Sequence, residues 1–499
     1  MKILTVEQTR ALDQYTIEHE PVAPLNLMER AAQAFTDWYT ARFDKNRPVR
    51  IFCGLGNNGG DGLAIARLLI QLDYTVQTCV VRYAPRESED FMHNHRRLKL
   101  LASIKYIESE QDIPVIRPKE VVIDAILGSG LSRTTEGLVQ SVIDAINHSP
   151  ATVVAVDIAS GLFADTANGP NATIVQPDYT VAFQLPKLAF LLPTLSLYVG
   201  EWHWVDIGLS RAYIERTPTT YFYTTDQEVR HLLRTRNRFS HKGSFGHALL
   251  LVGSYGKIGA GVLASRACLR SGVGLLSVQV PRCGYEILQT SVPEAMCQPD
   301  GHLHILTGQP EVEQPELDTF SAVGVGPGIG TAPETLEMLR KLLASVKKPM
   351  VIDADAINLI AKNRDLIDKI PKNSILTPHP KEFERLTRRW TSDYDKLGIL
   401  RDFAQRNRFV VVLKGANTAI ATPDGTTHFN STGNPGMSTG GTGDVLTGIL
   451  TALLAQGYDP VEAAVLGVFE HGRAGDRAAD LRGQIGLTAS DVIEALRWD

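Results

Sequence analysis

The chain has 499 residues, about three to four times the usual length of a single domain, so two or more domains are expected. Hydrophobic residues make up 43% and charged residues 21%, which excludes a disordered, collagenous or coiled-coil protein. The 50 basic and 55 acidic residues give a net charge of -5 without a long block of one sign. Neither nucleic acid nor a membrane is therefore expected as a partner, and small-molecule chemistry is the better expectation.

The five cysteines and the first residues indicate a reducing compartment. An odd number of cysteines without a CxxC pair fits buried thiols better than disulfides or a zinc site. The start, MKILTVEQTRALDQ, turns polar after a few apolar residues, unlike a signal peptide. The most apolar stretch, Phe183 to Gly200, carries Lys187 and two prolines and is a poor membrane span. We expect a cytoplasmic homo-oligomer.

Short β-branched runs, each followed by a glycine-rich turn and a helical pattern, are typical of parallel α/β domains. They fall into two groups, at residues 50–62, 121–131 and 153–162, and at residues 247–261, 322–330, 350–360 and 410–421. Residues 214–243 lack such turns, so a domain boundary is expected near Thr217 to Thr225. One continuous sheet is the alternative, but open sheets usually split into separate cores above about 250 to 300 residues.

Helical periodicity predicts five helices, at Val6–Glu18, Asn26–Ala41, Gly62–Gln71, Ala260–Ser271 and Val445–Gln456. The last of these follows Gly441, Thr442, Gly443 and Asp444. Threonine and aspartate start helices well, and glycines let a ligand approach the backbone closely. An anion site is therefore expected at the start of this helix.

Gly54, Gly56 and Gly59 form a G-x-G-x-x-G turn between a strand and a helix, which is the context of a dinucleotide fingerprint. A dehydrogenase that binds NAD should carry an acidic residue at the end of the next strand. Here that strand ends at Arg82, which at best suits a 2′-phosphate. Only a dehydrogenase of the NADP type stays open as an alternative.

Polar side chains gather around this turn. Asn58 and Asp61 sit in the turn itself, and Asp124 and Asp157 each end an apolar strand, so they converge if the strands are adjacent. With Ser160 they offer hard oxygen ligands suited to an alkali or alkaline-earth cation, or one aspartate could move a proton. The alternative is that both aspartates only cap the segments that follow.

Four motifs of this half, LMERAAQAF, GLGNNGGDGLAIARLL, DAILGSGLSR and VDIASGL, resemble the epimerase domain of the enzymes that repair hydrated NADH and NADPH. The resemblance covers nearly all of residues 1–210. The chain departs from it at Ala32, where glycine is frequent, and at Ala159, where DIPSGL is usual. It implies a potassium ion held by Asn58, Asp124 and Ser160. It also implies that the hydrated nucleotide is bound by Asn57, Asn58, Gly59, Gly60, Asp61, Gly128, Ser129, Gly130, Leu131, Ser132, Arg133, Thr134 and Asp157.

Exchange of the two hydrate epimers requires the ring to open and reclose at C6, which needs a proton acceptor and a proton donor. Asp157 is the predicted base. Lys187, in the apolar context FQLPKLAFLL, is the predicted partner acid. The alternative is a lysine that snorkels at a sheet edge.

The second half contains no G-x-x-x-x-G-K-[ST] motif, which excludes a P-loop enzyme. Its strongest signal is NPGMSTGGTGD, at residues 434–444, before an apolar helix. Glycine amides at a helix start bind phosphate, and a carboxylate beside them accepts the proton of an attacking hydroxyl. Asp444 is the predicted base. The alternative is a plain helix cap, but the glycines would then be costly in entropy.

This loop resembles the anion hole of ribokinase-like kinases, and the motifs from His241 to Gly475 resemble the ADP/ATP-dependent NAD(P)H-hydrate dehydratase. They include HKGSFGHALLLVGSYGKIGAG, GPGIG, VIDADAIN, LTPHPKEFERL, VVLKGANTAI and GGTGDVLTG. The resemblance implies ADP or ATP as co-substrate, with Mg²⁺. It implies nucleotide contacts from Lys414, Gly415, Ala416, Asn417, Thr418 and Gly443. It implies contacts to the hydrated dinucleotide from Ala260, Gly328, His379 and Asp444.

Some of these residues keep a second interpretation. His379 could instead be a turn histidine satisfied by the backbone. Asp353 and Asp355 end a strand and are expected only to support a metal ion or water.

We therefore expect an N-terminal Rossmann-like three-layer α/β/α domain, residues 1–218, and a C-terminal ribokinase-like α/β domain, residues 219–499. The expected function is epimerisation of hydrated NADH and NADPH and nucleotide-dependent dehydration of the S form through a phosphorylated intermediate. The alternative is a kinase of a small alcohol fused to a non-catalytic nucleotide-binding domain.

Overall fold

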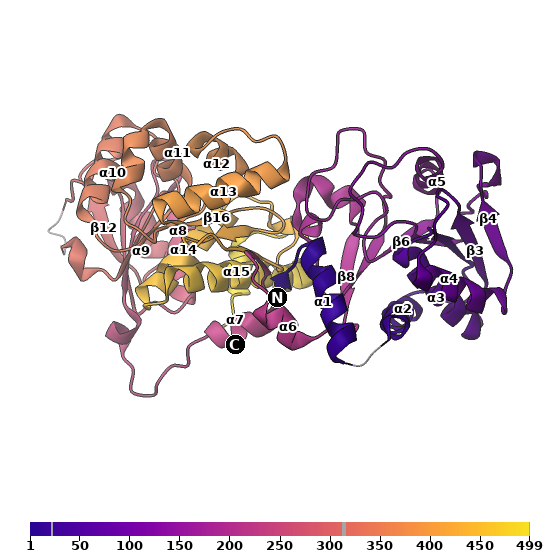
Figure 1. Ribbon diagram of the computed structural model, residues 1–499. Coiled ribbons are helices and arrows are strands. Elements are labelled where there is room, and N and C mark those ends of the chain that lie inside the picture. The colour runs from indigo at the N-terminus through magenta and orange to yellow at the C-terminus, as the bar shows by residue number, and fades with distance from the viewer. Residues whose placement is uncertain (21–22, 312–315, 499) are drawn as a thin grey trace. The chain divides into compact units, whose positions relative to one another are not determined.

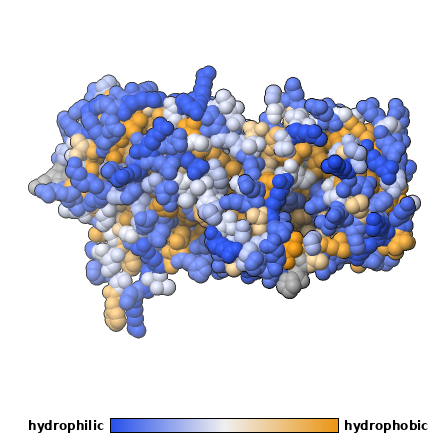
Figure 2. All heavy atoms as spheres, viewed as in Figure 1, coloured by the Kyte–Doolittle hydropathy of each residue, from blue (hydrophilic) through white to orange (hydrophobic). Residues whose placement is uncertain are grey.

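The computed structural model describes residues 1–20, 23–311 and 316–498. The chain divides into two compact units, Lys2–Thr219 and Met1 with Thr220–Asp499 (Figure 1). The strands form two separate sheets, so the alternative of one continuous sheet is wrong. On the face drawn in Figure 2, hydrophilic residues predominate and apolar ones lie scattered between them. No helix in the described ranges is long and apolar enough to cross a membrane.

The N-terminal unit is built on a parallel sheet in the order β4-β3-β2-β5-β6-β7-β8. The strands of this sheet are β2 (Val49–Cys53), β3 (Val76–Val81), β4 (Ile104–Ile107), β5 (Val121–Ala125), β6 (Thr152–Val156), β7 (Tyr179–Phe183) and β8 (Glu201–Val205). The short strand β1 (Lys2–Ile3) does not belong to it. The helices of the unit are α1 (Val6–His19), α2 (Pro24–Thr40), α3 (Asn57–Gln71), α4 (Glu89–Lys99), α5 (Leu138–Asn147) and α6 (Arg211–Arg216).

The strands of this sheet are apolar on both faces, which is why they read as continuous hydrophobic runs. Ile51 and Val121 belong to one buried cluster, while the next residues, Phe52 and Val122, belong to the other. Successive side chains therefore enter opposite apolar layers, each covered by helices. This confirms the three-layer, Rossmann-like arrangement.

The strand order reverses between β2 and β5, because β3 and β4 lie on one side of β2 and β5 to β8 on the other. Ligands of open α/β sheets bind beyond the carboxyl ends of the strands at such a point. Gly54, directly after β2, packs so closely on Ile126 that a Cβ would collide with the Ile126 carbonyl. The glycine motif thus places the end of β2 against the segment after β5.

The C-terminal unit has a larger sheet that contains the order β9-β18-β17-β16-β15-β14-β13-β10-β11-β12. The β16–β17 and β17–β18 pairs are antiparallel and the other pairs parallel. The strands are β9 (Tyr221–Tyr223), β10 (His247–Leu251), β11 (Leu275–Pro281), β12 (Met296–Asp300), β13 (Ala322–Val325), β14 (Met350–Ile352), β15 (Ile375–Leu376), β16 (Val410–Leu413), β17 (Ala419–Ala421) and β18 (Thr427–Phe429).

The helices of this unit are α7 (Asp226–Leu232), α8 (Ile258–Arg270), α9 (Tyr285–Ser291), α10 (Pro333–Ser345), α11 (Ala354–Lys362), α12 (Pro380–Leu386), α13 (Asp393–Asn407), α14 (Thr442–Ala455), α15 (Pro460–Arg482) and α16 (Ala489–Glu494). Helix α14 is apolar on all sides and is buried from Val445 to its end. Gly448 allows α14 to touch α8, because a Cβ there would collide with the Ala264 carbonyl. This packing fixes the start of α14, where the anion site was predicted.

All five predicted helices are present within a few residues of their expected ends, with one correction. Helix α3 begins at Asn57, not at Gly62, so Asn57 and Asn58 lie in its first turn and Asp61 directly after it. The sequence predicts a turn here because Gly59, Gly60 and Gly62 are poor helix formers. Close packing requires these glycines, since a Cβ at Gly59 would strike the Gly54 carbonyl.

Candidate active sites

Asp124 and Ser160 meet at the carboxyl ends of the neighbouring strands β5 and β6. The Ser160 hydroxyl donates to Asp124 Oδ1 at 2.6 Å and its backbone N–H donates to Oδ2 at 2.8 Å. Both residues are 0% exposed. Burial raises the pKa of Asp124 to about 6, against the opposing effect of the hydrogen bonds from Ser160. A bound cation would stabilise the ionised form of this buried carboxyl group.

Asn58 adds an unsatisfied hydrogen-bond acceptor to the site formed by Asp124 and Ser160. Its Nδ2 donates to the Leu127 carbonyl at 3.0 Å, whereas its buried Oδ1 has no hydrogen-bond partner among the described residues. The Leu127 carbonyl also accepts from the Ser160 hydroxyl, at 3.2 Å. The Leu127 carbonyl and the Ser160 hydroxyl thus connect the three predicted potassium ligands through hydrogen bonds. An orphaned buried oxygen is costly unless a ligand satisfies it.

Asp157 follows β6 directly and forms an ion pair with Lys187. Its Oδ1 also accepts from the Phe183 N–H at 3.0 Å, and its backbone has φ +65°, a left-handed conformation that is rare outside glycine. Lys187 is 7% exposed. It therefore does not snorkel at a sheet edge; that alternative is wrong. The structure brings the two predicted catalytic residues of this half into direct contact.

Asp157 acts on two further carboxyl groups, those of Asp61 and Asp13. Burial, then Asp157, Asp90 and Asp13, raise the pKa of Asp61 well above its ordinary range. Burial and then Asp157 raise the pKa of Asp13 to about 7, and Lys187 opposes this shift. Asp13 lies in α1, where the sequence showed only helical periodicity and no motif. The sequence interpretation missed it for that reason.

Only part of the predicted substrate loop, residues 128–134, lies at this site. Gly128 packs against the Asn58 side chain, and a Cβ on Gly130 would collide with the Arg10 guanidinium. Ser132, Arg133 and Thr134 are exposed. The glycines of the loop therefore approach the site, and its last residues lie at the surface.

In the C-terminal unit, a cavity of about 570 Å³ opens at the start of α14. Its walls come from the segment after β16, residues 430–438, the first turn of α14 and the middle of α15. Of the six predicted nucleotide contacts, five line it: Lys414, Gly415, Ala416, Thr418 and Gly443. Asn417 is not among the lining residues. Amide groups at a helix start and an ammonium group suit a polyphosphate.

Lys414 is held in this wall by Asp353. Its Nζ donates to Asp353 Oδ1 at 2.9 Å, and the Thr447 hydroxyl donates to Oδ2 at 2.8 Å. Asp353 is 1% exposed, so this carboxylate is buried with both oxygens engaged. Its place agrees with the supporting role expected from the sequence.

A second cavity, of about 410 Å³, is lined by Asp444 of the α14 start. Three of the four predicted dinucleotide contacts, Ala260, Gly328 and Asp444, line it. Asp355 also lines it and accepts from Lys257 Nζ at 3.2 Å. Sequence reasoning assigned no role to Lys257, although it lies within the motif HKGSFGHALLLVGSYGKIGAG.

His379 lines the first cavity instead of the second. Its Nδ1 accepts from the Lys381 N–H at 3.1 Å and caps α12, and its Nε2 lies 3.4 Å from Glu382 Oε1. Burial and the charge of Lys414 lower its pKa. The histidine is thus satisfied locally, as the alternative interpretation held, while one edge faces the nucleotide cavity.

Asp444 occupies the first turn of α14, one residue after Gly443. Burial, and next Asp353, raise its pKa to about 6, and Lys414 opposes this shift. Gly443 lines the first cavity and Asp444 the second. Two neighbouring residues at one helix start thus face two cavities, as a transfer between two bound molecules requires.

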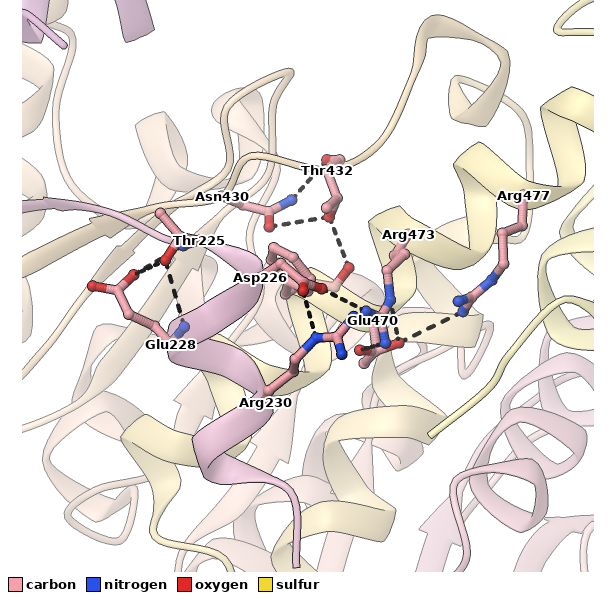
Figure 3. Close-up of polar contacts among 10 residues, drawn as sticks. Thr225, Asp226, Glu228, Arg230, Asn430, Thr432, Glu470, Arg473 and Arg477 are labelled. Atoms are coloured by element: carbon pink, nitrogen blue, oxygen red, sulfur yellow. Dashed lines mark hydrogen bonds and ion pairs between the residues drawn. The ribbon is translucent and has the colours of Figure 1, made fainter. Parts of the chain in front are cut away.

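Helix α15 forms part of the wall of the nucleotide cavity. The sequence did not predict this role. His471 lines the cavity, and its buried Nε2 has no hydrogen-bond partner in the described chain. Burial lowers the pKa of His471 to about 4, so the ring is neutral. The Thr432 hydroxyl donates to the Phe469 carbonyl at 2.7 Å and ties the cavity wall to the helix (Figure 3).

Below this wall, Glu470 is fully buried between two arginines of the same helix. Arg473 lies 2.6 Å from Glu470 and 2.7 Å from Asp226 of α7 (Figure 3). The ion pairs fix α15 beside the cavity. No short motif in the sequence marks this network, because Asp226 lies 247 residues before Arg473 in the chain.

A Rossmann-like unit with buried carboxylates and a ribokinase-like unit with two cavities at one helix start together define a two-domain enzyme that acts on nucleotides. Comparison with known families agrees with this class. A family model described as YjeF-related protein N-terminus matches residues 24–189, and one described as NAD(P)H-hydrate dehydratase matches residues 248–497.

Full-length relatives give the family. The bifunctional NAD(P)H-hydrate repair enzyme of Moorella thermoacetica is 35% identical and aligns with 100% of this chain and 96% of its own length. The enzyme of the same name from Escherichia coli is 33% identical, over 94% of this chain and 88% of its own. The chain belongs to the bifunctional NAD(P)H-hydrate repair enzymes.

A solved structure is similar to the C-terminal unit. It is the ADP/ATP-dependent NAD(P)H-hydrate dehydratase of Bacillus subtilis, co-crystallised with ATP and Mg²⁺. It is 30% identical and covers 56% of this chain and 97% of its own, with a TM-score of 0.49.

Proposed function

We propose that the N-terminal unit interconverts the R and S forms of hydrated NADH and NADPH, and that the C-terminal unit dehydrates the S form with ADP or ATP. The observation that carries this proposal is the position of Gly443 and Asp444. One faces a cavity suited to a nucleotide and the other a cavity suited to the hydrate.

In the dehydration, Asp444 accepts the proton of the hydroxyl on C6 of the hydrate. The hydroxyl oxygen attacks the terminal phosphorus of the nucleotide, whose bond to the leaving phosphate oxygen breaks. The amides at the start of α14 and the Lys414 ammonium stabilise the charge on the transferred group. Phosphate then leaves C6 as the ring nitrogen donates its electron pair, and loss of a proton from C5 restores the double bond.

Mg²⁺ fits this site because Asp353 and Asp444 repel each other, which contributes to the raised pKa of Asp444. Asp444 would face the ion, which neutralises phosphate charge when bound, and the buried Asp353, with both oxygens engaged, would support it only through its charge.

Potassium fits the N-terminal unit. Asn58, Asp124 and Ser160 would hold it, and the orphaned Asn58 Oδ1 supports this assignment. A bound cation supplies a fixed positive charge beside the buried Asp124 carboxylate. We expect potassium, but not choline, to raise the melting temperature of the wild-type chain, and Asp124→Asn to lose this response. An equal response in the variant would refute the site.

In the epimerisation, Asp157 accepts the proton of the C6 hydroxyl. Lys187 lies against the same carboxylate and neutralises its charge. Breaking of the bond between C6 and the ring nitrogen leaves an aldehyde, and the ring recloses on either face of it.

The test supplies both epimers of NADH hydrate with ADP or ATP and follows restored NADH and residual R form. Wild type should consume both epimers. Asp157→Asn should repair the S form and leave the R form unused. If the variant loses repair of both forms equally, Asp157 has no specific role in epimerisation. No recovery of NADH by wild type would refute the proposed function.

A further inference from the structure

Helix α1 lies over the proposed epimerase site and precedes residue 24, where the family match begins. Its ends are fixed to the unit: the Val6 N–H donates to Asp165 Oδ2 at 2.8 Å, and the Thr16 hydroxyl accepts from the Ser210 N–H at 3.1 Å. Between them, the Arg10 guanidinium lies against Gly130 of the substrate loop. The middle of α1 therefore faces the site.

Asp13 lies three residues after Arg10, so both side chains project from one face of the helix. Its carboxyl group is half-buried. The charged groups that act on it come from other elements: Asp157 after β6 and Lys187 before the turn at 188–191. Asp13 in turn acts on Asp61 in α3. Its carboxyl group thus belongs to the same cluster of charges as the predicted base.

The proposed reaction needs a proton donor, and Lys187 is poorly placed for that role. Its ammonium group is already bound to Asp157 and lies 3.5 Å from the Leu185 carbonyl. Asp13 and Asp157 share this single ammonium group, and charge repulsion links both of them to Asp61. Their repulsion keeps a proton within the cluster at neutral pH.

The proton on Asp13 is the one that exchanges readily. Burial and Asp157 raise the pKa of Asp13 to about 7, where donor and acceptor forms coexist. Burial raises the pKa of Asp61 well above its ordinary range, which favours its protonated form. We propose that Asp13 is the proton donor of the epimerase, with Asp157 as the acceptor, an inference that rests on the proposed epimerase activity.

The step is balanced by these two residues. Asp157 takes the hydroxyl proton, the oxygen forms a double bond to C6, and the bond from C6 to the ring nitrogen breaks. Its electron pair goes to the nitrogen, which receives the proton of Asp13. After rotation of the aldehyde, the nitrogen returns its proton to Asp13 and attacks the other face of C6, and the oxygen regains the proton held by Asp157.

The test compares Asp13→Asn, Asp13→Glu and Glu18→Gln in the full chain. Glu18 is an exposed carboxylate of the same helix, so its variant controls for charge on α1. Exchange of pure S into R hydrate is measured by chromatography without nucleotide. Repair of S hydrate with ATP serves as the internal control for folding.

We expect Asp13→Asn to slow epimer exchange by about 100-fold or more while S repair stays within about twofold. Asp13→Glu should restore part of the rate with a shifted pH profile, and Glu18→Gln should match wild type. Exchange by Asp13→Asn within about threefold of wild type would overturn the inference, as would an unchanged profile in Asp13→Glu. A wild-type chain without exchange would instead reject the epimerase proposal itself.

Discussion

Replacement of Asp444 by asparagine tests the proposed phosphoryl transfer most directly. Asparagine keeps the size and the polar contacts of the side chain at the start of α14 but cannot accept a proton. Positioned general bases contribute about 10² to 10⁴ in rate, equal to about 3 to 5 kcal/mol of transition-state stabilisation. We therefore expect Asp444→Asn to lower nucleotide-dependent repair of S hydrate by at least about 100-fold.

The pH dependence gives a second measure of the same residue. Burial and Asp353 raise the pKa of Asp444 to about 6. Only the ionised form accepts a proton, so wild-type activity should fall about tenfold per pH unit on the acid side of this value. Asp444→Asn should show no such decline, because its residual activity needs no ionised group at this position.

The assay follows NADH absorbance with pure S hydrate and ATP from mildly acidic to neutral pH. Asp459→Asn is the matched control, because Asp459 is an exposed helix cap of α15 and asparagine caps equally well. Epimer exchange should persist in both variants. Repair by Asp444→Asn above about a tenth of wild type, or an acid decline that it shares with wild type, would refute the proposed base.

Three further predictions concern binding and stability. Lys414→Met should raise the KM for ATP and lower kcat, since it removes the ammonium group between Asp353 and the nucleotide cavity; steady-state kinetics with unaltered constants would contradict this. His471→Phe should weaken ATP binding by about 3- to 10-fold in calorimetry, the value of one hydrogen bond to Nε2. Glu120→Gln should cost about 3 to 5 kcal/mol in urea unfolding, because Arg50 is left buried without its partner at 2.8 Å. Burial acts to raise the pKa of Glu120, but Arg50 holds it below its ordinary value, so the difference between variant and wild type should shrink as pH falls through that lowered value.

The parts of the sites that follow from strand order could be predicted from the sequence. Asp124 and Asp157 each end an apolar run, and parallel strands carry such residues to one edge of a sheet. The same reasoning located Asp444, because glycines before an apolar helix have few other uses. Strand adjacency was an assumption at that stage, and the neighbouring positions of β5 and β6 satisfy it.

Residues that reach a site from outside the sheet could not be predicted in this way. Asp13 lies in an ordinary amphipathic helix, and His471 lies in a long helix of mixed composition. In both cases the periodicity gives the face of the helix but not the element that this face meets. The function of such residues depends on tertiary packing, which short motifs do not encode.

In each unit, a non-glycine residue with a left-handed backbone follows a strand that ends at the proposed site: Asp157 after β6 and Ala354 after β14. Asp157 has φ +65° and Ala354 has φ +48°, a conformation that costs a non-glycine residue about 1 to 3 kcal/mol. At Ala354 the strained turn separates two neighbouring carboxylates: Asp353 turns to Lys414 of the nucleotide cavity, and Asp355 lines the second cavity. The strained turn at residue 354 thus lies between a buried carboxylate that holds Lys414 and a partly exposed carboxylate that lines the second cavity.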